Sequence, residues 1–233
     1  MLYIGLNFGV VAGNIAAHAA GINAFRVFAA TIILVIPALI GTRLLFVLSH
    51  WQFYRRNPRK VFSRHQGGAR QYGGFALVLP LSVPLLRALH LPFGAFWDCA
   101  AFTILSTMIV GRFGCLMQGC CAGRPWAGWC SVNLPNHLGV WRRRIPTQFL
   151  EAGWAAILLI GGIAFWNKRP FPGAFFLLAT AAYAGARAVM ESWREPDSRT
   201  VNNLTTYQLT VYQGVSVAMT VLALAALLIR WPK

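Results

Sequence analysis

The stretch from Gly111 to Trp126, GRFGCLMQGCCAGRPW, combines residue types that could bind an anionic group. Its glycines let the backbone turn tightly and approach a ligand closely, and its arginines offer forked donors that match a phosphate or a carboxylate. An arginine at the mouth of a membrane helix is costly unless it contacts a partner, so Arg112 predicts a binding site. The alternative interpretation, a loop with snorkelling arginines and buried cysteines, stays open.

Five cysteines could contribute thiol chemistry, and four of them lie between Cys115 and Cys130. Their spacing has no paired C-x-x-C, so it gives little indication of a zinc site, and we expect no metal and no cofactor. Cys99 is typical of a small buried side chain. For the others a disulfide or a reactive thiol stays open. Cys120 or Cys121 could carry a covalent intermediate, with Cys115 as a third possible thiol.

A second set of charges recurs at helical spacing later in the chain. Tyr183, Arg187 and Glu191 are four residues apart and therefore share one helix face. Arg187 and Glu191 are also spaced for an ion pair within the helix. If the apolar spans alternate across a membrane, several charged residues reach the same side and favour a polar site within a helical bundle. These residues are Arg112, Glu151, Arg187, Glu191 and Arg194.

The composition indicates which elements position these residues. The chain has 233 residues, of which 57% are hydrophobic and only 11% are charged. This balance is typical of an all-α, polytopic transmembrane helical bundle, and we expect a single integral membrane domain over 1–233. The formal net charge of +16 lies mainly between the apolar segments, which favours anionic lipid headgroups as partners over nucleic acid. No segment is typical of a cleaved signal peptide.

The hydropathy pattern predicts about six or seven spans, since a spanning helix needs about 20 apolar residues. The predicted spans are 25–48, 74–89, 96–110, 145–166, 173–190 and 212–229, with 2–20 as a doubtful or re-entrant one. An interfacial arm rich in cations and aromatics is expected at about 50–72. The motif loop is expected at about 111–146. Arg43, near the end of one span, is either a snorkelling side chain or a residue that faces a site.

Several stretches resemble, in order, the motifs of the prolipoprotein diacylglyceryl transferase family. RQYGGF at 70–75 resembles its Gly-Gly element, and residues 111–126 resemble its G-R-x-G-N-F-x-N-G-E-x-x-G-R signature. IPTQFLE at 145–151 resembles H-P-S/T-Q-x-Y-E, and YAGARAVMESWREPD at 183–197 resembles Y-x-x-x-R-x-x-x-E-x-x-R-x-P-D. GTRLLFVLSH at 41–50 resembles the helix before the arm. Each motif alone is weakly specific, whereas the ordered set is fairly specific.

The resemblance implies a multi-pass enzyme of the bacterial plasma membrane. Family members move the diacylglyceryl group of phosphatidylglycerol onto a cysteine thiol of a prelipoprotein and release glycerol phosphate. The positions that match imply catalytic roles for Arg112, Arg187, Tyr72 and Glu151. Substrate-binding roles are expected for Arg43, Gly73, Gly74, Gly111, Gly114, Gln118, Gly119, Gly123, Arg124, Gln148, Glu191 and Arg194. Tyr72 or Glu151 could relay the thiol proton, while Glu191 is expected to hold Arg187 in place.

The chain departs from the family motifs at five positions. Cys115 and Gln118 replace asparagines, Cys120 replaces a glutamate, Ile145 replaces a histidine, and Leu150 replaces a tyrosine. These changes put the acceptor, and with it the reaction, in question. Two alternatives therefore stay open: a membrane thiol-redox protein that uses the Cys115–Cys130 cluster, and a non-catalytic protein that binds anionic lipid.

Charge and resemblance predict opposite orientations in the membrane. The family's catalytic side is extracytoplasmic, whereas lysines and arginines gather in cytoplasmic loops. Here the motif side carries the arm and most of the loop arginines. We expect the arm's cations to bind headgroups instead of setting the topology, which keeps the site extracytoplasmic.

Overall fold

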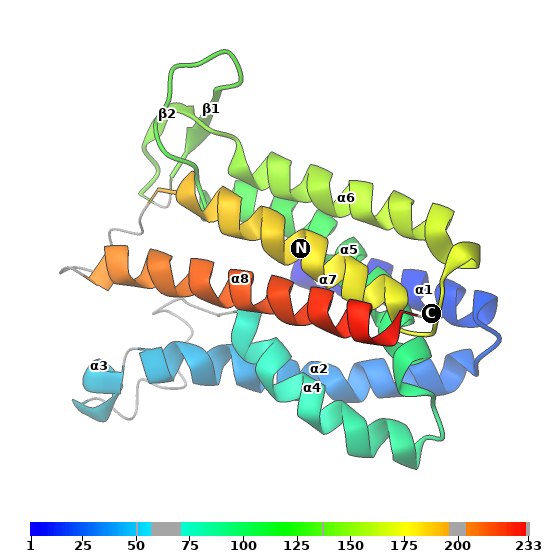
Figure 1. Cartoon of the computed structure of the whole chain (residues 1–233). Coiled ribbons are helices and arrows are strands. Elements are labelled where there is room, and N and C mark those ends of the chain that lie inside the picture. The colour runs from blue at the N-terminus through cyan, green and yellow to red at the C-terminus, as the bar shows by residue number, and fades with distance from the viewer. Residues whose placement is uncertain (50, 57–70, 137, 196–203, 232–233) are drawn as a thin grey trace. The chain divides into compact units, whose positions relative to one another are not determined.

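In a computed structural model of the chain, residues 1–49, 51–56, 71–136, 138–195 and 204–231 are described. Helices dominate these residues, as the sequence predicts (Figure 1). The helices are α1 (Leu2–Ala19), α2 (Ala24–Ser49), α3 (Trp51–Arg56), α4 (Gln71–Ala88), α5 (Phe93–Met117), α6 (Thr147–Phe165), the short 3₁₀ helix η3 (Trp166–Lys168), α7 (Ala174–Ser192) and α8 (Leu204–Arg230). Two short strands, β1 (Val132–Pro135) and β2 (Trp141–Arg144), form a hairpin between α5 and α6.

Four helical segments in the described part of the chain are long and apolar enough to cross a membrane. They are Ala24–Leu48, Phe93–Met117, Thr147–Lys168 and Tyr212–Arg230. The prediction of an all-α membrane bundle is confirmed, although fewer helices reach the length and hydropathy of a span than the six or seven expected. The apolar part of α4 is shorter, at Tyr72–Ala88, and α7 carries charged side chains on one face.

The helices form two compact units. The first comprises Met1–Ala20 and Gly94–Lys233, and the second comprises Gly21–Phe93. All the ion pairs described below belong to the first unit, in which α7 packs against both α6 and α8.

The end of α5 lies further along the chain than the sequence suggested. The helix was expected to end at Val110, but it continues to Met117, so Gly111, Gly114 and Cys115 are helical. Glycine in a helix interior costs only about 1 kcal/mol relative to alanine, which packing can offset. The helix ends where Gly119 adopts a left-handed φ of 63°. The motif loop therefore begins at Gln118 and not at Gly111.

The β1–β2 hairpin was not predicted. Its register pairs Val132 with Arg144 and Pro135 with Trp141, and Asn136 closes the turn by accepting hydrogen bonds from backbone amides at 3.0 Å. An isolated bridge between Pro125 and Arg144 joins the motif loop to the hairpin. Figure 1 shows the hairpin beside the first turn of α6 and the last turn of α7. The loop is therefore held by backbone pairing at the end of the unit where α6 begins.

Buried Asp98 joins α5 to α7 at the other end of these helices. Its carboxylate accepts hydrogen bonds from the backbone amides of Gly173 (2.8 Å) and Phe176 (2.9 Å), and it pairs with Arg169 at 3.1 Å. Free amides at a helix N-terminus and the helix dipole both favour a carboxylate there. The contact fixes the start of α7 relative to α5 and thereby helps to set which side chains face each other further along.

In the second unit, α2 and α4 cross at glycines. A Cβ atom on Gly41 would lie 2.3 Å from the carbonyl oxygen of Gly73, and one on Gly73 would lie 2.2 Å from that of Gly41. Small residues permit such close approach of helices in a membrane. The guanidinium of Arg43 lies over the rings of Phe46 (5.4 Å) and Tyr54 (5.8 Å). Most of the expected arm, residues 57–70, lies outside the described residues.

Candidate active site

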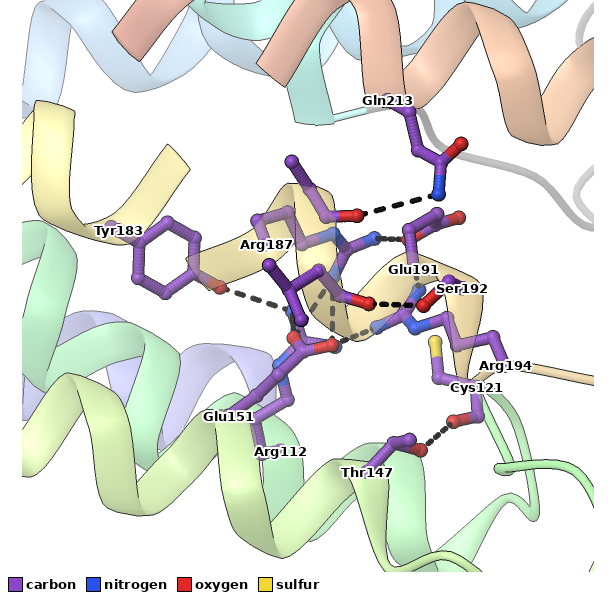
Figure 2. Close-up of polar contacts among 12 residues, drawn as sticks. Arg112, Cys121, Thr147, Glu151, Tyr183, Arg187, Glu191, Ser192, Arg194 and Gln213 are labelled. Carbon is purple, nitrogen blue, oxygen red and sulfur yellow. Dashed lines mark hydrogen bonds and ion pairs between the residues drawn. The ribbon is translucent and has the colours of Figure 1, made fainter. Parts of the chain in front are cut away.

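Glu151, on the second turn of α6, is at the centre of a buried cluster of charges (Figure 2). Only 2% of the residue is exposed. Its carboxylate pairs with Arg112 from α5, with Arg187 from α7 at 2.9 Å, and with Arg194, which follows α7. Two parts of the chain far apart in the sequence, α5 and the end of α7 with the residues after it, thus bring their arginines to one carboxylate on α6. The sequence analysis expected these charges on one side of a bundle, but not that they would share Glu151.

Two further residues of α7 orient these arginines. Glu191 pairs with Arg187 at 3.0 Å across one helical turn and with Arg194 at 3.6 Å. Tyr183 accepts a hydrogen bond from Arg112 at 3.3 Å between Nη2 and the hydroxyl oxygen. The ion pair expected between Arg187 and Glu191 is confirmed. Because Tyr183 and Arg187 are one turn apart, the same face of α7 contacts both α5 and α6.

The cluster carries an excess of positive charge. Three arginines face two carboxylates, Glu151 and Glu191, which leaves one net positive charge among these five side chains as long as the neighbouring Cys121 thiol keeps its proton. Burial lowers the pKa of Arg194, but a neighbouring cysteine and the two carboxylates raise it by more, so the guanidinium stays charged. A buried surplus charge is unfavourable without a counter-ion. The arrangement therefore favours a bound monoanion.

The cysteine thiols lie beside this charge. Hydrogen bonds from Cys115 and Cys120 lower the pKa of the Cys121 thiol, and the charges of Arg194 and Arg112 add to this effect, against the opposing effect of burial. The pKa of Cys120 is raised, because its thiol is hydrogen-bonded to Cys115 and Cys121. Cys121 is therefore the thiol of this group that loses its proton first.

The first turn of α6 holds the motif loop. Thr147 donates its hydroxyl to the carbonyl of Cys121 at 2.8 Å, and Gln148 donates its side-chain amide to the carbonyl of Cys120 at 3.0 Å. Gly123 lies so close to the segment just before α6 that a Cβ atom would be 2.1 Å from the carbonyl oxygen of Ile145. The Thr-Gln pair and the glycine of the sequence motifs thus position the loop backbone in this structure.

The remaining loop residues have several different surroundings. Gly119 is buried against the backbone of Asn136, while Gln118 is exposed. Arg124 is also exposed and donates its Nε to the carbonyl of Arg194 at 3.2 Å, so it ties the loop to the segment after α7. On α5, nothing lies within 4 Å of a Cβ placed on Gly111, whereas one on Gly114 would contact Met1.

The remaining predicted residues belong to the second unit. Gly73 and Gly74 lie in α4 and pack against α2, where a Cβ on Gly74 would be 3.1 Å from the carbonyl oxygen of Ala38. In the structure these glycines therefore permit the close approach of α4 to α2. Tyr72 is half-buried at the start of α4. The roles of Tyr72 and Arg43 toward a substrate stay predictions.

A family model for prolipoprotein diacylglyceryl transferases matches residues 1–229, almost the whole chain. The chain belongs to the prolipoprotein diacylglyceryl transferase family. It is a membrane protein of that family, and the charge cluster lies within the matched residues.

Several curated relatives carry the name phosphatidylglycerol–prolipoprotein diacylglyceryl transferase. One from Dehalococcoides mccartyi is 30% identical over 179 residues, which cover 73% of this chain and 66% of the relative. One from Clostridium kluyveri is 23% identical over 224 residues, covering 92% of this chain and 86% of the relative. The match thus spans just under two thirds of the first relative. These names do not support the thiol-redox or the purely lipid-binding alternative.

The sequence analysis of this transferase-family chain predicted neither the Asp98–Arg169 pair nor a second ion pair, at the hairpin. Arg144, at the end of β2, is buried and pairs with Glu195, and it also donates to the carbonyl of Gly123 at 3.3 Å. A run of three arginines before α6 was visible in the sequence, but nothing in its spacing distinguished the buried one. The pair fastens the hairpin to the segment after α7.

Proposed function

We propose that this protein transfers the diacylglyceryl group of phosphatidylglycerol to a cysteine thiol of a prelipoprotein in the bacterial plasma membrane, with release of glycerol phosphate. The observation that carries the proposal is the surplus positive charge held by Arg112, Arg187 and Arg194 around Glu151. A phosphodiester headgroup is a monoanion, so its charge equals the surplus. Arginine forks bind such oxygens through two parallel hydrogen bonds.

An apolar groove in the same unit supports a lipid substrate. The groove has a volume of about 320 Å³ and involves α1, α5 and α6. Its lining includes Phe8, Val11, Ile15, Ile109, Val110 and Leu159. Val110 lies two positions before Arg112 on α5, about 3 Å along the helix axis but on a different face of the helix. The groove is thus an apolar surface near the level of Arg112 that suits the acyl chain of a membrane lipid.

The chemistry follows from these contacts. The sulfur of the acceptor forms a bond to the terminal glycerol carbon of the diacylglyceryl group, and the bond from that carbon to the phosphate oxygen breaks. The leaving oxygen takes the electron pair, and Arg112 and Arg187 stabilise the charge that develops on the phosphate. The thiol proton passes to a base. Since both oxygens of Glu151 are ion-paired, we assign Glu151 to positioning the arginines. Tyr72 is the base that the family resemblance alone implies.

The test uses purified full-length protein, phosphatidylglycerol labelled in its headgroup, and a peptide with the acceptor cysteine. Release of labelled glycerol phosphate that depends on the peptide thiol is the expected result. Arg112→Ala should reduce turnover by about 100-fold or more, the effect of removing a donor to a developing oxyanion. Arg87→Ala, which removes an exposed arginine at the end of α4, is the matched control and should keep wild-type turnover.

Two results would contradict the proposal. Glycerol phosphate release that is the same with a Cys→Ser peptide would exclude the thiol as acceptor. Wild-type turnover in Arg112→Ala, with the protein inserted and folded, would remove the arginine cluster from the mechanism. Binding of phosphatidylglycerol without release would instead favour a lipid-binding protein.

A further inference from the structure

Cys115, Cys120 and Cys121 form a cluster that the proposed transfer reaction does not use. Their three Sγ atoms all lie within 4.8 Å of one another, and none of them is in a disulfide. Zinc–thiolate bonds are about 2.3 Å long, so sulfurs that share one zinc ion lie about 4 Å apart. The observed separations thus need only small side-chain movements to place all three sulfurs around one ion.

The backbone is built to bring these thiols together. Cys115 lies on the last turn of α5, and the chain then turns back through Gly119 (φ 63°) and Cys121 (φ 59°). A non-glycine residue with a left-handed φ is uncommon and persists only where its surroundings hold it. Hydrogen bonds from Thr147 and Gln148 to the carbonyls of Cys121 and Cys120 supply that support. The two cysteines are therefore fixed by α6 and not only by the loop.

Charge and access also suit a metal. Three thiolates around a divalent ion carry one net negative charge, and Arg112 and Arg194 interact electrostatically with Cys121. All three cysteines are half-buried. A metal ion can therefore reach the thiols from solvent, while the surrounding protein still excludes much of the water from the metal–sulfur bonds. Thiolate ligands select zinc and other soft metals over magnesium or calcium.

We propose that Cys115, Cys120 and Cys121 bind a thiophilic divalent metal ion such as Zn²⁺ through three thiolates, with the fourth coordination position left to an external ligand. Zinc sites with three protein ligands and one open position are the type in which the metal contacts a reactant. The sequence analysis expected no metal here, because the four residues between Cys115 and Cys120 replace the usual C-x-x-C spacing.

Metal binding is measured directly, without turnover, so the result does not depend on the proposed transfer reaction. Reduced, chelator-treated full-length protein is titrated with Zn²⁺ against a coloured chelator. One ion should bind per chain. Ser substitution of Cys115, Cys120 or Cys121 should each weaken binding by roughly tenfold or more, since loss of even an outer-shell partner has effects of that order. Cys130→Ser, at an exposed thiol outside the cluster, should bind like wild type.

A second measurement on the wild-type chain needs no substitution. Native protein is alkylated with and without Zn²⁺, and the modified cysteines are located by mass spectrometry. The metal should protect Cys115, Cys120 and Cys121, while Cys130 is alkylated in both samples. Absence of metal-dependent protection, formation of a disulfide in the cluster in place of metal binding, or equal loss of affinity in Cys130→Ser would each overturn the site.

Discussion

Glu151 joins three arginines that no other described carboxylate could hold together. Only Glu191 shares part of the task, through Arg187 and Arg194. A buried ion pair is weak evidence for stability, since desolvation offsets most of its Coulomb energy. Removing one partner is different, because the remaining buried charges lose their counter-charge. The Glu151 carboxylate is thus a fixed anion that positions the three arginines to bind a second anion.

The first prediction concerns this carboxylate. Glu151→Gln leaves three buried arginines with one carboxylate, so we expect a loss of about 3–5 kcal/mol in the free energy of unfolding. Thermal unfolding in detergent measures it. The Glu195 side chain is 27% exposed, so Glu195→Gln should lower the free energy of unfolding by less. Added inorganic phosphate should stabilise Glu151→Gln more than wild type, because it supplies the missing anion. An unchanged melting temperature in Glu151→Gln would contradict the ion-pair assignment.

The second prediction concerns the acidity of Cys121. Its lowered pKa means that the thiolate forms at a lower pH than in an ordinary cysteine. Its alkylation rate should therefore rise less steeply between about pH 6 and pH 8 than that of an ordinary thiol with a pKa of about 8.5, which reacts roughly tenfold faster per pH unit over that range. Arg194→Ala should raise the pKa and make the pH profile steeper. A profile like that of N-acetylcysteine in wild type would refute the assignment.

At the residue scale the sequence indicated much of the cluster. Arg112, Arg187 and Glu191 followed from helical spacing and from alternation of the spans, because charges on helix faces have few ways to avoid lipid. The contact between Arg112 and Tyr183 and the burial of Arg144 could not be predicted. Both depend on which turn of one helix meets which turn of another, and packing decides that.

Among the elements, the motif loop is positioned chiefly by close backbone contacts. Gly123 pairs with Arg194 in an isolated bridge, and Arg124 donates its backbone amide to the carbonyl of Trp193 at 2.8 Å. The loop therefore joins the start of α6 to the end of α7 without relying on side chains alone. Its glycine is needed for space, since the neighbouring atom is a carbonyl oxygen that cannot rotate away.

The third prediction tests this contact. Gly123→Ala places a Cβ 2.1 Å from the carbonyl oxygen of Ile145, so the loop must shift, and we expect a loss of about 1–3 kcal/mol in stability together with reduced turnover. Gly153→Ala is the matched control. That glycine is helical and exposed, with nothing within 4 Å of its added Cβ, so the change should be neutral or slightly stabilising. Equal effects of the two substitutions would contradict the packing argument.

Element boundaries were predicted unevenly. The end of α2 and the start of α6 lie close to their expected positions. A long apolar run marks the first, and a proline before the helix marks the second. The extension of α5 and the β1–β2 hairpin were missed. Helical glycines look like loop residues in a sequence, and four-residue strands with exposed aromatic and charged side chains show no alternation that would reveal them.

At the scale of the whole molecule, the orientation in the membrane links the site to its acceptor. Loop charge and family resemblance predict opposite sides, and the structure offers a native reporter. Cys130 is exposed in the segment between α5 and the hairpin. Its accessibility from one side of the membrane therefore reports the side of the motif loop.

The fourth prediction uses this reporter. In intact cells, a membrane-impermeant maleimide should label Cys130 from the extracytoplasmic side, as an exported prelipoprotein acceptor requires. Cys130→Ser shows which signal belongs to this thiol, and lysed cells give the full extent of labelling. Labelling only after lysis would place the loop in the cytoplasm and contradict the proposed acceptor.

The surplus positive charge of the arginine cluster has a consequence for the end of the proposed reaction. A phosphodiester carries one negative charge, but the glycerol phosphate that leaves is a monoester with a second ionisation near pH 6. At neutral pH the product therefore attracts the arginines more strongly than the substrate headgroup did. In the proposed reaction we therefore expect glycerol phosphate to leave more slowly than a monoanion would. Added glycerol phosphate should inhibit competitively, and less so as the medium becomes acidic.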